Sequence, residues 1–256
     1  MRKTGGLGSG HCGHGSDSTP VSYEPAVDRL RAESERRPPD AVGEAHNGPV
    51  TIVQPTLSLF DEPPVPYHDR VVVDGTDKFA WLRARSRGVT ATDAARLTSQ
   101  KSVTAVAMEK LLGSRFGGNA YTEHGLIREP HIGRWANSVY GMRHSSALFH
   151  ADGNRDHLAT PDGLRERDGI LELCEIKTTV KGWRGIPRHY LRQVWWQQYV
   201  LGAERTLVVW ERHEDFVPVH ADPECRWVDR DENEIHRLVV LADQLLVALK
   251  RDPRAR

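Results

Sequence analysis

Two carboxylates and one amine stand close together in the sequence, at Asp162, Glu175 and Lys177. Glu175 and Lys177 are separated by one residue in the β-rich segment 170–178, and alternate residues of a strand point to the same face. Asp162 lies in a Pro-Asp-Gly turn before this segment, within reach of that face. A core strand has no structural need for this cluster, whereas a divalent cation with an activated water does. The pattern therefore predicts a metal site.

The elements that would position this cluster can be read from the neighbouring sequence. Strands are expected at 146–150, 157–160, 170–178, 205–211 and 215–220. The segment between the Pro-Asp-Gly turn and residue 170 is expected to be a loop. A last helix is expected to begin with the capping box Asp231-x-x-Glu234 and to carry an apolar stripe.

A helix is also expected to start at Pro187 and to run to residue 201. It places Tyr190, Gln193 and Gln197 on one side, at spacings of three and four residues. Polar glutamines on an otherwise aromatic helix suit a site, and solvent exposure explains them equally well.

Residues 122–140 predict a helix interrupted near Pro130. Gly125 and Glu129 are four residues apart and share a face, where the glycine allows another element to approach closely. Glu129 would add a third carboxylate to the metal site, although an exposed helix glutamate is the simpler interpretation of its spacing.

The segment 81–95 starts as a helix, breaks at Gly88 and restarts with Thr92 or Asp93 as the expected N-cap. Arg85 beside such a helix start would make a small anion site, because free N–H groups and a guanidinium both bind phosphate. Capping without a ligand explains the same residues. Further along, the loop 181–188 is basic and suits contact with a DNA backbone through Lys181 and Arg184.

Composition limits the class of protein. The 256 residues carry 35 basic and 35 acidic side chains. The chain therefore lacks the net positive charge that would indicate binding to nucleic acid. The 3 cysteines are too few for a four-cysteine iron–sulfur cluster and indicate reduced thiols rather than a disulfide framework. An apolar run of membrane-spanning length and a signal peptide are both lacking in the sequence, which favours a cytoplasmic protein.

Residues 1–65 differ in composition from the rest, with 8 of the 22 glycines and 8 of the 15 prolines. We expect a disordered tail there and one folded domain at 66–256. Within the tail, Leu57, Leu59 and Phe60 resemble the short peptide by which bacterial replication proteins dock on the sliding clamp. Packing of these residues on the folded domain is the alternative.

Several motifs recur in the order known from one family. They are Trp81-x-x-x-Arg85-x-x-Gly88-Val-Thr-Ala-Thr92, Gly125-x-x-x-Glu129, Pro161-Asp162-Gly, Glu175-Ile176-Lys177 and Tyr190-x-x-Gln193. The series resembles the YqaJ-like viral recombinases, which are lambda-exonuclease-type members of the PD-(D/E)xK nuclease superfamily. Thr92 departs from the serine usual in the family but keeps the hydroxyl.

The resemblance implies a fold, an activity and a set of residue roles. The fold would be a restriction-endonuclease-like α/β domain with a mixed central sheet flanked by helices. The activity would be metal-dependent 5′→3′ degradation of one strand of linear double-stranded DNA, in a phage or prophage setting.

The resemblance also assigns roles to single residues. The ligands of Mg²⁺ or Mn²⁺ would be Asp162, Glu175, Glu129 and the Ile176 carbonyl. Lys177 would orient or deprotonate the attacking water. Gln193 would support the site beside Tyr190, and Tyr190 would also contact the DNA backbone. Arg85 and Thr92 would hold the 5′-phosphate.

The resemblance also implies partners, and it leaves two rival functions open. A single-strand annealing protein would be the partner, and a homo-oligomeric ring around DNA is implied by analogy alone. One rival is an endonuclease of the same fold, and the other is a non-catalytic protein that binds DNA ends.

Overall fold

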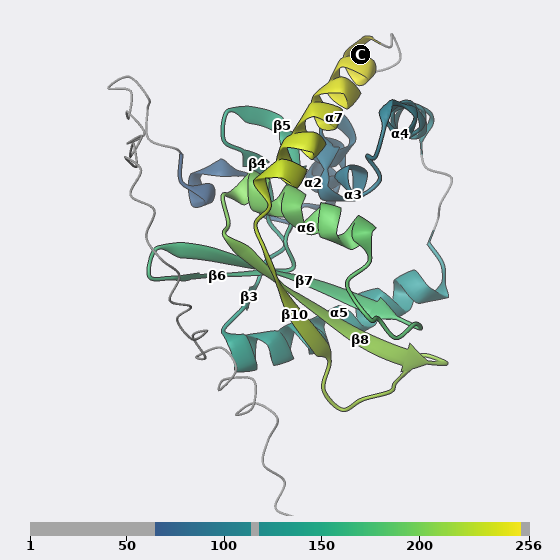
Figure 1. Cartoon of the computed structure of the whole chain (residues 1–256), viewed down its shortest axis with the longest axis vertical. Coiled ribbons are helices and arrows are strands. Elements are labelled where there is room, and N and C mark those ends of the chain that lie inside the picture. Colours follow the sequence, from purple (N-terminus) through teal and green to yellow (C-terminus); the bar gives the residue numbers. More distant parts are fainter. Residues whose placement is uncertain (1–64, 114–117, 252–256) are drawn as a thin grey trace, which may run out of the picture. The chain divides into compact units, whose positions relative to one another are not determined.

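The computed structural model describes residues 65–113 and 118–251, which form two β-sheets and several helices (Figure 1). The predicted fold class, α/β with mixed sheets flanked by helices, is confirmed. The tail predicted for residues 1–65 lies outside the described residues except for its last residue, and so does the clamp-like peptide at 57–60.

The larger sheet has the strand order β10-β8-β7-β6-β3, and β9 pairs with β8. Its strands are β3 (Arg143–His144), β6 (Gly163–Arg167), β7 (Ile170–Thr179), β8 (Arg205–Glu214), β9 (Val217–Pro218) and β10 (Glu224–Asp229). The central pair, β7 and β8, is parallel, whereas β6 and β10 flank it in antiparallel orientation. The sheet is therefore mixed, as expected.

The second sheet has the order β1-β4-β5-β2. Its strands are β1 (Val71–Val73), β2 (Val89–Thr90), β4 (Leu148–Ala151) and β5 (Asn154–Ala159). The strand β2 pairs with β5 in parallel, directly after Gly88. A Cβ atom at Gly88 would lie 2.5 Å from the Asp156 carbonyl oxygen, so only glycine allows this approach.

The helices cover both faces of the larger sheet. They are the 3-10 helix η1 (Tyr67–Arg70), α2 (Lys78–Arg87), α3 (Ala91–Ala94), α4 (Gln100–Leu112), α5 (Ala120–Tyr140), α6 (Arg188–Leu201) and α7 (Glu232–Arg251). The helix α5 packs its Ile132 and Ala136 with Cys174 and Ile176 of β7 in one core cluster. The helix α6 belongs to the other core cluster with Leu173. Alternate residues of β7 therefore face different helices.

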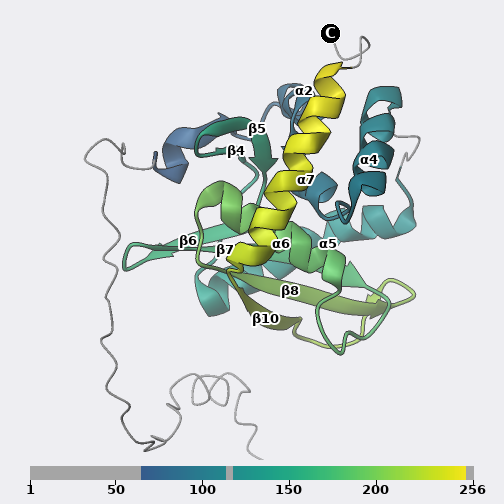
Figure 2. The ribbon, with the colours of Figure 1, turned by 45° about the horizontal axis from the view of Figure 1, so that its top comes forward.

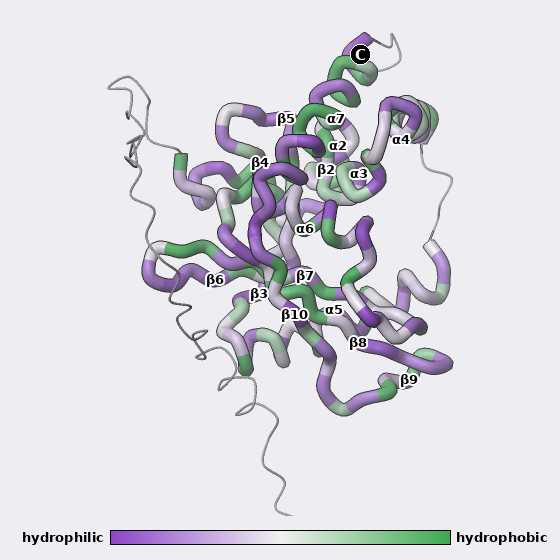
Figure 3. Tube along the Cα trace, viewed as in Figure 1, coloured by the Kyte–Doolittle hydropathy of each residue, from purple (hydrophilic) through white to green (hydrophobic). Residues whose placement is uncertain are grey.

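Helix α7 packs on α6 and α4, and α6 also contacts β4 and β5 of the smaller sheet (Figure 2). Apolar and polar stretches alternate along α7 (Figure 3), as expected for a helix with one buried stripe. Ile235, Leu238, Leu245 and Leu249 are buried there, as predicted. The Asp231 carboxylate accepts a hydrogen bond from the Glu234 N–H at 3.1 Å, which confirms Asp231 as the cap. The Glu234 carboxylate, the other half of the predicted box, accepts from Arg188 and Arg237.

Three sequence predictions about strands and the continuity of helices were wrong. The expected loop before residue 170 is the strand β6, which joins β7 through Asp168 and Gly169, both with positive φ. The main antiparallel partner of β8 is β10, and the expected partner at 215–220 supplies only β9. Helix α5 continues through Pro130. Pro130 is exposed, so water can satisfy the carbonyl that it leaves without an N–H donor.

Among the described residues, no helix combines the length and apolar character that crossing a bilayer requires.

Candidate active site

The strand β7 has a free edge beyond Cys174, because the pairing with β6 ends at that residue. Asp162 folds onto this edge. Its N–H donates to the Cys174 carbonyl at 3.1 Å, and its Oδ2 accepts from the Ile176 N–H at 2.6 Å. The N–H and C=O of one strand residue point to the same side. The Ile176 carbonyl is therefore directed to the edge where the Asp162 carboxylate lies.

Glu175 and Lys177 project from the face of β7 that α6 covers. Glu175 is only 2% exposed, and both of its carboxylate oxygens accept hydrogen bonds. Lys177 Nζ and Gln193 Nε2 both donate to its Oε1. Gln197 Nε2 donates to its Oε2 at 2.6 Å. The structure thus brings together Asp162, Glu175, Lys177 and Gln193, which the sequence predicted as one group.

The charges of this group are unbalanced. Burial and the neighbouring Glu175 carboxylate raise the pKa of Asp162 well above its ordinary value. Burial alone would lower the pKa of Lys177, but the carboxylates of Glu175 and Asp162 outweigh burial and raise it. Lys177 therefore carries its proton, and one ammonium faces two crowded carboxylates. A bound cation would relieve this repulsion.

Glu129 approaches the same edge from the opposite layer. Gly125 lies one turn before Glu129 on α5, and Gly133 lies one turn after it. Both glycines face β7. A Cβ atom added to Gly125 would lie 3.4 Å from Thr178 Oγ1, and one added to Gly133 would lie 3.7 Å from Ile176 Cδ1. Glu129 shares their face of the helix. Its charge also helps to raise the pKa of Asp162. The close approach of another element at Gly125, which the sequence predicted, is that of β7.

The available ligands suit a hard cation. Among the described residues, no three His, Cys, Asp or Glu side chains are close enough to form a complete metal cage. Mg²⁺ does not need one, since it keeps several waters and binds through one or two carboxylates. Asp162, Glu175 and the Ile176 carbonyl offer such a partial, all-oxygen set, and Glu129 is in electrostatic range.

The predicted phosphate residues lie on α2 and α3. Arg85 is half-buried, and its guanidinium lies 4.2 Å from the Trp81 ring centroid. Burial lowers the pKa of Arg85, and the charge of Asp93 opposes this shift. The predicted N-cap was wrong, because Thr90 caps α3 in a reciprocal capping box with Asp93. Thr92 is exposed one position inside this short helix.

A direct contact joins helix α6, which carries Gln193, to the end of α3. Arg192 Nε, next to Gln193 on α6, donates to the Ala95 carbonyl at the end of α3 at 2.8 Å. Lys110 Nζ of α4 further fixes this region by donating to the Arg85 carbonyl at 3.1 Å and to Asp93 Oδ2 at 2.8 Å. Neither Arg192 nor Lys110 carried a signal in the sequence.

The basic loop after β7 is anchored by its tryptophan. The Trp183 ring stacks on Trp210 with centroids 5.1 Å apart and lies 5.2 Å from the Tyr190 ring. Lys177 Nζ is in turn 5.2 Å from the Tyr190 ring centroid. Lys181 and Arg184 are exposed on either side of Trp183. The loop thus presents two exposed cations beside Trp183, and the Trp183 ring is linked to Lys177 through Tyr190.

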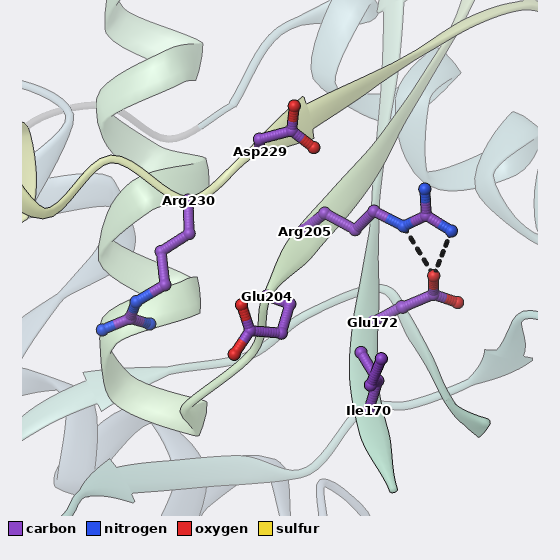
Figure 4. Close-up of a pocket in the computed structure, with 6 residues that line it drawn as sticks. All are labelled: Ile170, Glu172, Glu204, Arg205, Asp229 and Arg230. Atoms are coloured by element: carbon purple, nitrogen blue, oxygen red, sulfur yellow. Dashed lines mark hydrogen bonds and ion pairs between the residues drawn. The ribbon is translucent and has the colours of Figure 1, made fainter. Parts of the chain in front are cut away.

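A cavity of about 550 Å³ lies elsewhere, at the start of β7, and its lining is Ile170, Glu172, Glu204, Arg205, Asp229 and Arg230 (Figure 4). The Glu172 carboxylate in this cavity accepts hydrogen bonds from Arg165 and Arg205. Two arginines thus hold the Glu172 carboxylate on this side of β7.

Sequence reasoning placed Gln197 on the correct side of α6 but gave it no role. It is fully buried and contacts Glu175 directly. Its spacing of four residues from Gln193 was the available signal, because that spacing puts two amides on the same face of a helix.

Comparison with known proteins gives a match to one family over part of the chain, and a fold. Residues 80–204 match the family described as YqaJ-like viral recombinase domain. An alkaline exonuclease from Laribacter hongkongensis, LHK-Exo, aligns with a TM-score of 0.53 and 22% identity, over 66% of this chain and 91% of that chain. The complex of LHK-Exo with dAMP aligns with a TM-score of 0.52 at the same identity and coverage. These similarities establish a shared fold. Comparison with curated proteins finds no match.

Proposed function

Because the chain contains a YqaJ-like viral recombinase domain over residues 80–204, we propose that it is a metal-dependent exonuclease acting in recombination. The family supports a nuclease role in recombination. In our proposal, the enzyme degrades the 5′ strand of linear duplex DNA in the 5′→3′ direction and leaves a 3′ single strand. The observation that carries the proposal is the meeting of Asp162, Glu175 and Lys177 at the free edge of β7.

The metal ligands would be Asp162, Glu175 and the Ile176 carbonyl, with Glu129 completing the set. Hard oxygen ligands favour Mg²⁺ or Mn²⁺ over zinc. When bound, such a cation polarises a phosphoryl oxygen and supplies a hydroxide-like nucleophile near neutral pH.

Lys177 and Gln193 would act on the reacting groups without binding the cation. In the metal-free protein the carboxylates of Glu175 and Asp162 raise the pKa of Lys177. As an ammonium, Lys177 would donate hydrogen bonds to the attacking water and to phosphate oxygens. Gln193 donates to Glu175 Oε1 and so holds the carboxylate between α6 and β7.

Recognition of a 5′ end would come from the residues around α3. Arg85 supplies a planar cation held by Trp81, and Thr92 supplies an exposed hydroxyl. The contact between Arg192 and Ala95 fixes this region beside Gln193. Lys181, Arg184 and Tyr190 would contact the DNA backbone on the other side of the carboxylates.

The proposal extends to partners. A single-strand annealing protein would take up the 3′ strand in the host cytoplasm, and a ring of subunits would keep the enzyme on DNA. Docking on a sliding clamp through residues 57–60 also remains a proposal, since these residues lie outside the described part of the chain.

The test is digestion of a linear duplex whose two strands carry different end labels, with and without Mg²⁺. We expect Mg²⁺-dependent loss of the 5′-phosphorylated strand and survival of the 3′-ended strand, while closed circular DNA stays intact. Cutting of the circle would favour the endonuclease, and an untouched linear duplex would favour the non-catalytic end-binding protein.

A further inference from the structure

Two neighbouring glutamines of α6, Gln197 and Gln198, are both 0% exposed. A buried amide destabilises the fold unless its polar atoms find partners. In both residues the side-chain Nε2 has two acceptors, and the Oε1 is buried without a partner among the described residues. The two side chains therefore have nearly the same burial and the same incomplete hydrogen bonding.

Their partners differ in kind. Gln198 Nε2 donates to Thr206 Oγ1 at 3.1 Å and to the Val228 carbonyl at 2.9 Å, which ties α6 to β8 and β10. Gln197 Nε2 donates to Glu175 Oε2 at 2.6 Å and, more weakly, to the Thr160 carbonyl at 3.4 Å. Gln198 thus joins structural elements, whereas Gln197 holds a charged group of the candidate active site.

The hydrogen bonds also distinguish the two oxygens of the Glu175 carboxylate. Its Oε1 faces Lys177 and Gln193, both of which retain some exposure to solvent. Its Oε2 faces the interior, where Gln197 is the donor. Rotation of the carboxylate would break the bond to Gln197 and leave a buried oxygen without a donor, which is unfavourable.

We propose that Gln197 is a positioning residue of the cation site, which locks Glu175 so that Oε1 faces the entering metal ion. This inference rests on the proposed metal-dependent function. An amide bound to a ligating carboxylate fixes its orientation, and loss of such a partner typically weakens metal binding by about 10- to 100-fold.

The matched variants are Gln197→Met and Gln198→Met in the full-length chain. Methionine keeps the length of the side chain and removes the amide in both cases. Mn²⁺ binding without DNA is measured by titration calorimetry, and thermal unfolding is measured in chelator. We expect both variants to lose stability to a similar extent, but only Gln197→Met to bind Mn²⁺ about 10- to 100-fold more weakly. Its cleavage should recover at high Mn²⁺ concentration.

Two results would overturn the positioning role. One is Mn²⁺ binding by Gln197→Met within twofold of the wild type, and the other is equal weakening by Gln198→Met. If Gln197→Met does not fold, Gln197→Asn replaces it: this amide is one methylene too short to reach Glu175 Oε2 and should weaken binding similarly. Failure of the wild-type chain to bind Mn²⁺ would instead refute the proposed metal-dependent function itself.

Discussion

The strand β7 carries two buried glutamates in opposite situations. Glu172 lies near its start, 3% exposed, and Glu175 lies in its middle, 2% exposed. Around Glu172, two arginines donate to one carboxylate. Around Glu175, one ammonium is shared with a second carboxylate, that of the half-buried Asp162. Glu172 thus has two cationic partners of its own, whereas Glu175 and Asp162 share one.

The pKa shifts follow from this difference. Burial alone would raise the pKa of Glu172, but hydrogen bonds from Arg165 and Arg205 outweigh burial and lower it. At the other region, burial and Glu175 raise the pKa of Asp162. A buried ion pair with its charge balanced serves structure, whereas crowded carboxylates disfavour folding unless a cation joins them. We infer that the imbalance at Glu175 is retained for function.

The largest expected contrast is in activity. Glu175→Gln removes a proposed metal ligand and should lower the cleavage rate by at least about 100-fold. Glu172→Gln should leave the rate per folded molecule within about threefold, because its carboxylate contacts only arginines. Cleavage of linear duplex DNA, corrected for the folded fraction by circular dichroism, checks both. Equal losses in the two variants would remove the distinction between the regions.

Asp162→Asn should abolish cleavage and yet stabilise the metal-free protein. A raised folded-state pKa gives stability that is present below the ordinary value of 3.8 and is lost as pH rises through the folded-state pKa. At pH 8 the wild-type carboxylate therefore opposes folding, and the neutral amide removes this effect. Thermal unfolding in chelator at pH 8 measures it. A lower melting temperature for the variant would contradict the account of crowded carboxylates.

Glu172→Gln should lower the free energy of unfolding by about 2 kcal/mol at pH 7, because two buried charge-assisted hydrogen bonds weaken. The lowered pKa of Glu172 gives stability that is present above the ordinary value of 4.5 and is lost as pH falls through the folded-state pKa. The gap between wild type and variant should therefore close below pH 4.5. Urea denaturation at several pH values tests this, and a gap that persists in acid would argue against an ionic cause.

The smallest effect extends the comparison to two arginines of α2. Arg85 is half-buried over Trp81, whereas Arg83 is exposed over Phe79. Arg85→Ala should reduce the preference for 5′-phosphorylated over 5′-hydroxyl ends by about tenfold, the value of one hydrogen bond to a charged group. Arg83→Ala is the matched control and should keep the preference. Competition between the two substrates gives the ratio, and an unchanged ratio in Arg85→Ala would refute the phosphate role.

The sequence predicted the parts that depend on local periodicity. The alternation around Glu175 and Lys177, the helix carrying Gln193 and the stripe of α7 were confirmed because each follows from spacing alone. The grouping of Arg85 and Glu129 with these residues could be predicted only from the order of the family motifs. Spacing within one helix or strand does not show where residues of another element lie.

What the sequence missed depends on pairing between distant segments. Residues 224–227 of β10 alternate polar and apolar side chains, but a run this short does not identify a strand until it pairs with β8. The free edge of β7 arises because β6 stops at Cys174, a fact of register that no local pattern contains. The partner of Gln197 was missed for the same reason.

The central claim is that a cation binds at the free edge of β7, and anomalous scattering from crystals grown with Mn²⁺ tests it most directly. We predict a manganese peak within about 2.5 Å of the carboxylates of Asp162 and Glu175 and of the Ile176 carbonyl oxygen. A peak in the cavity beside Glu172, or no peak at the edge of β7 at saturating Mn²⁺, would contradict the account.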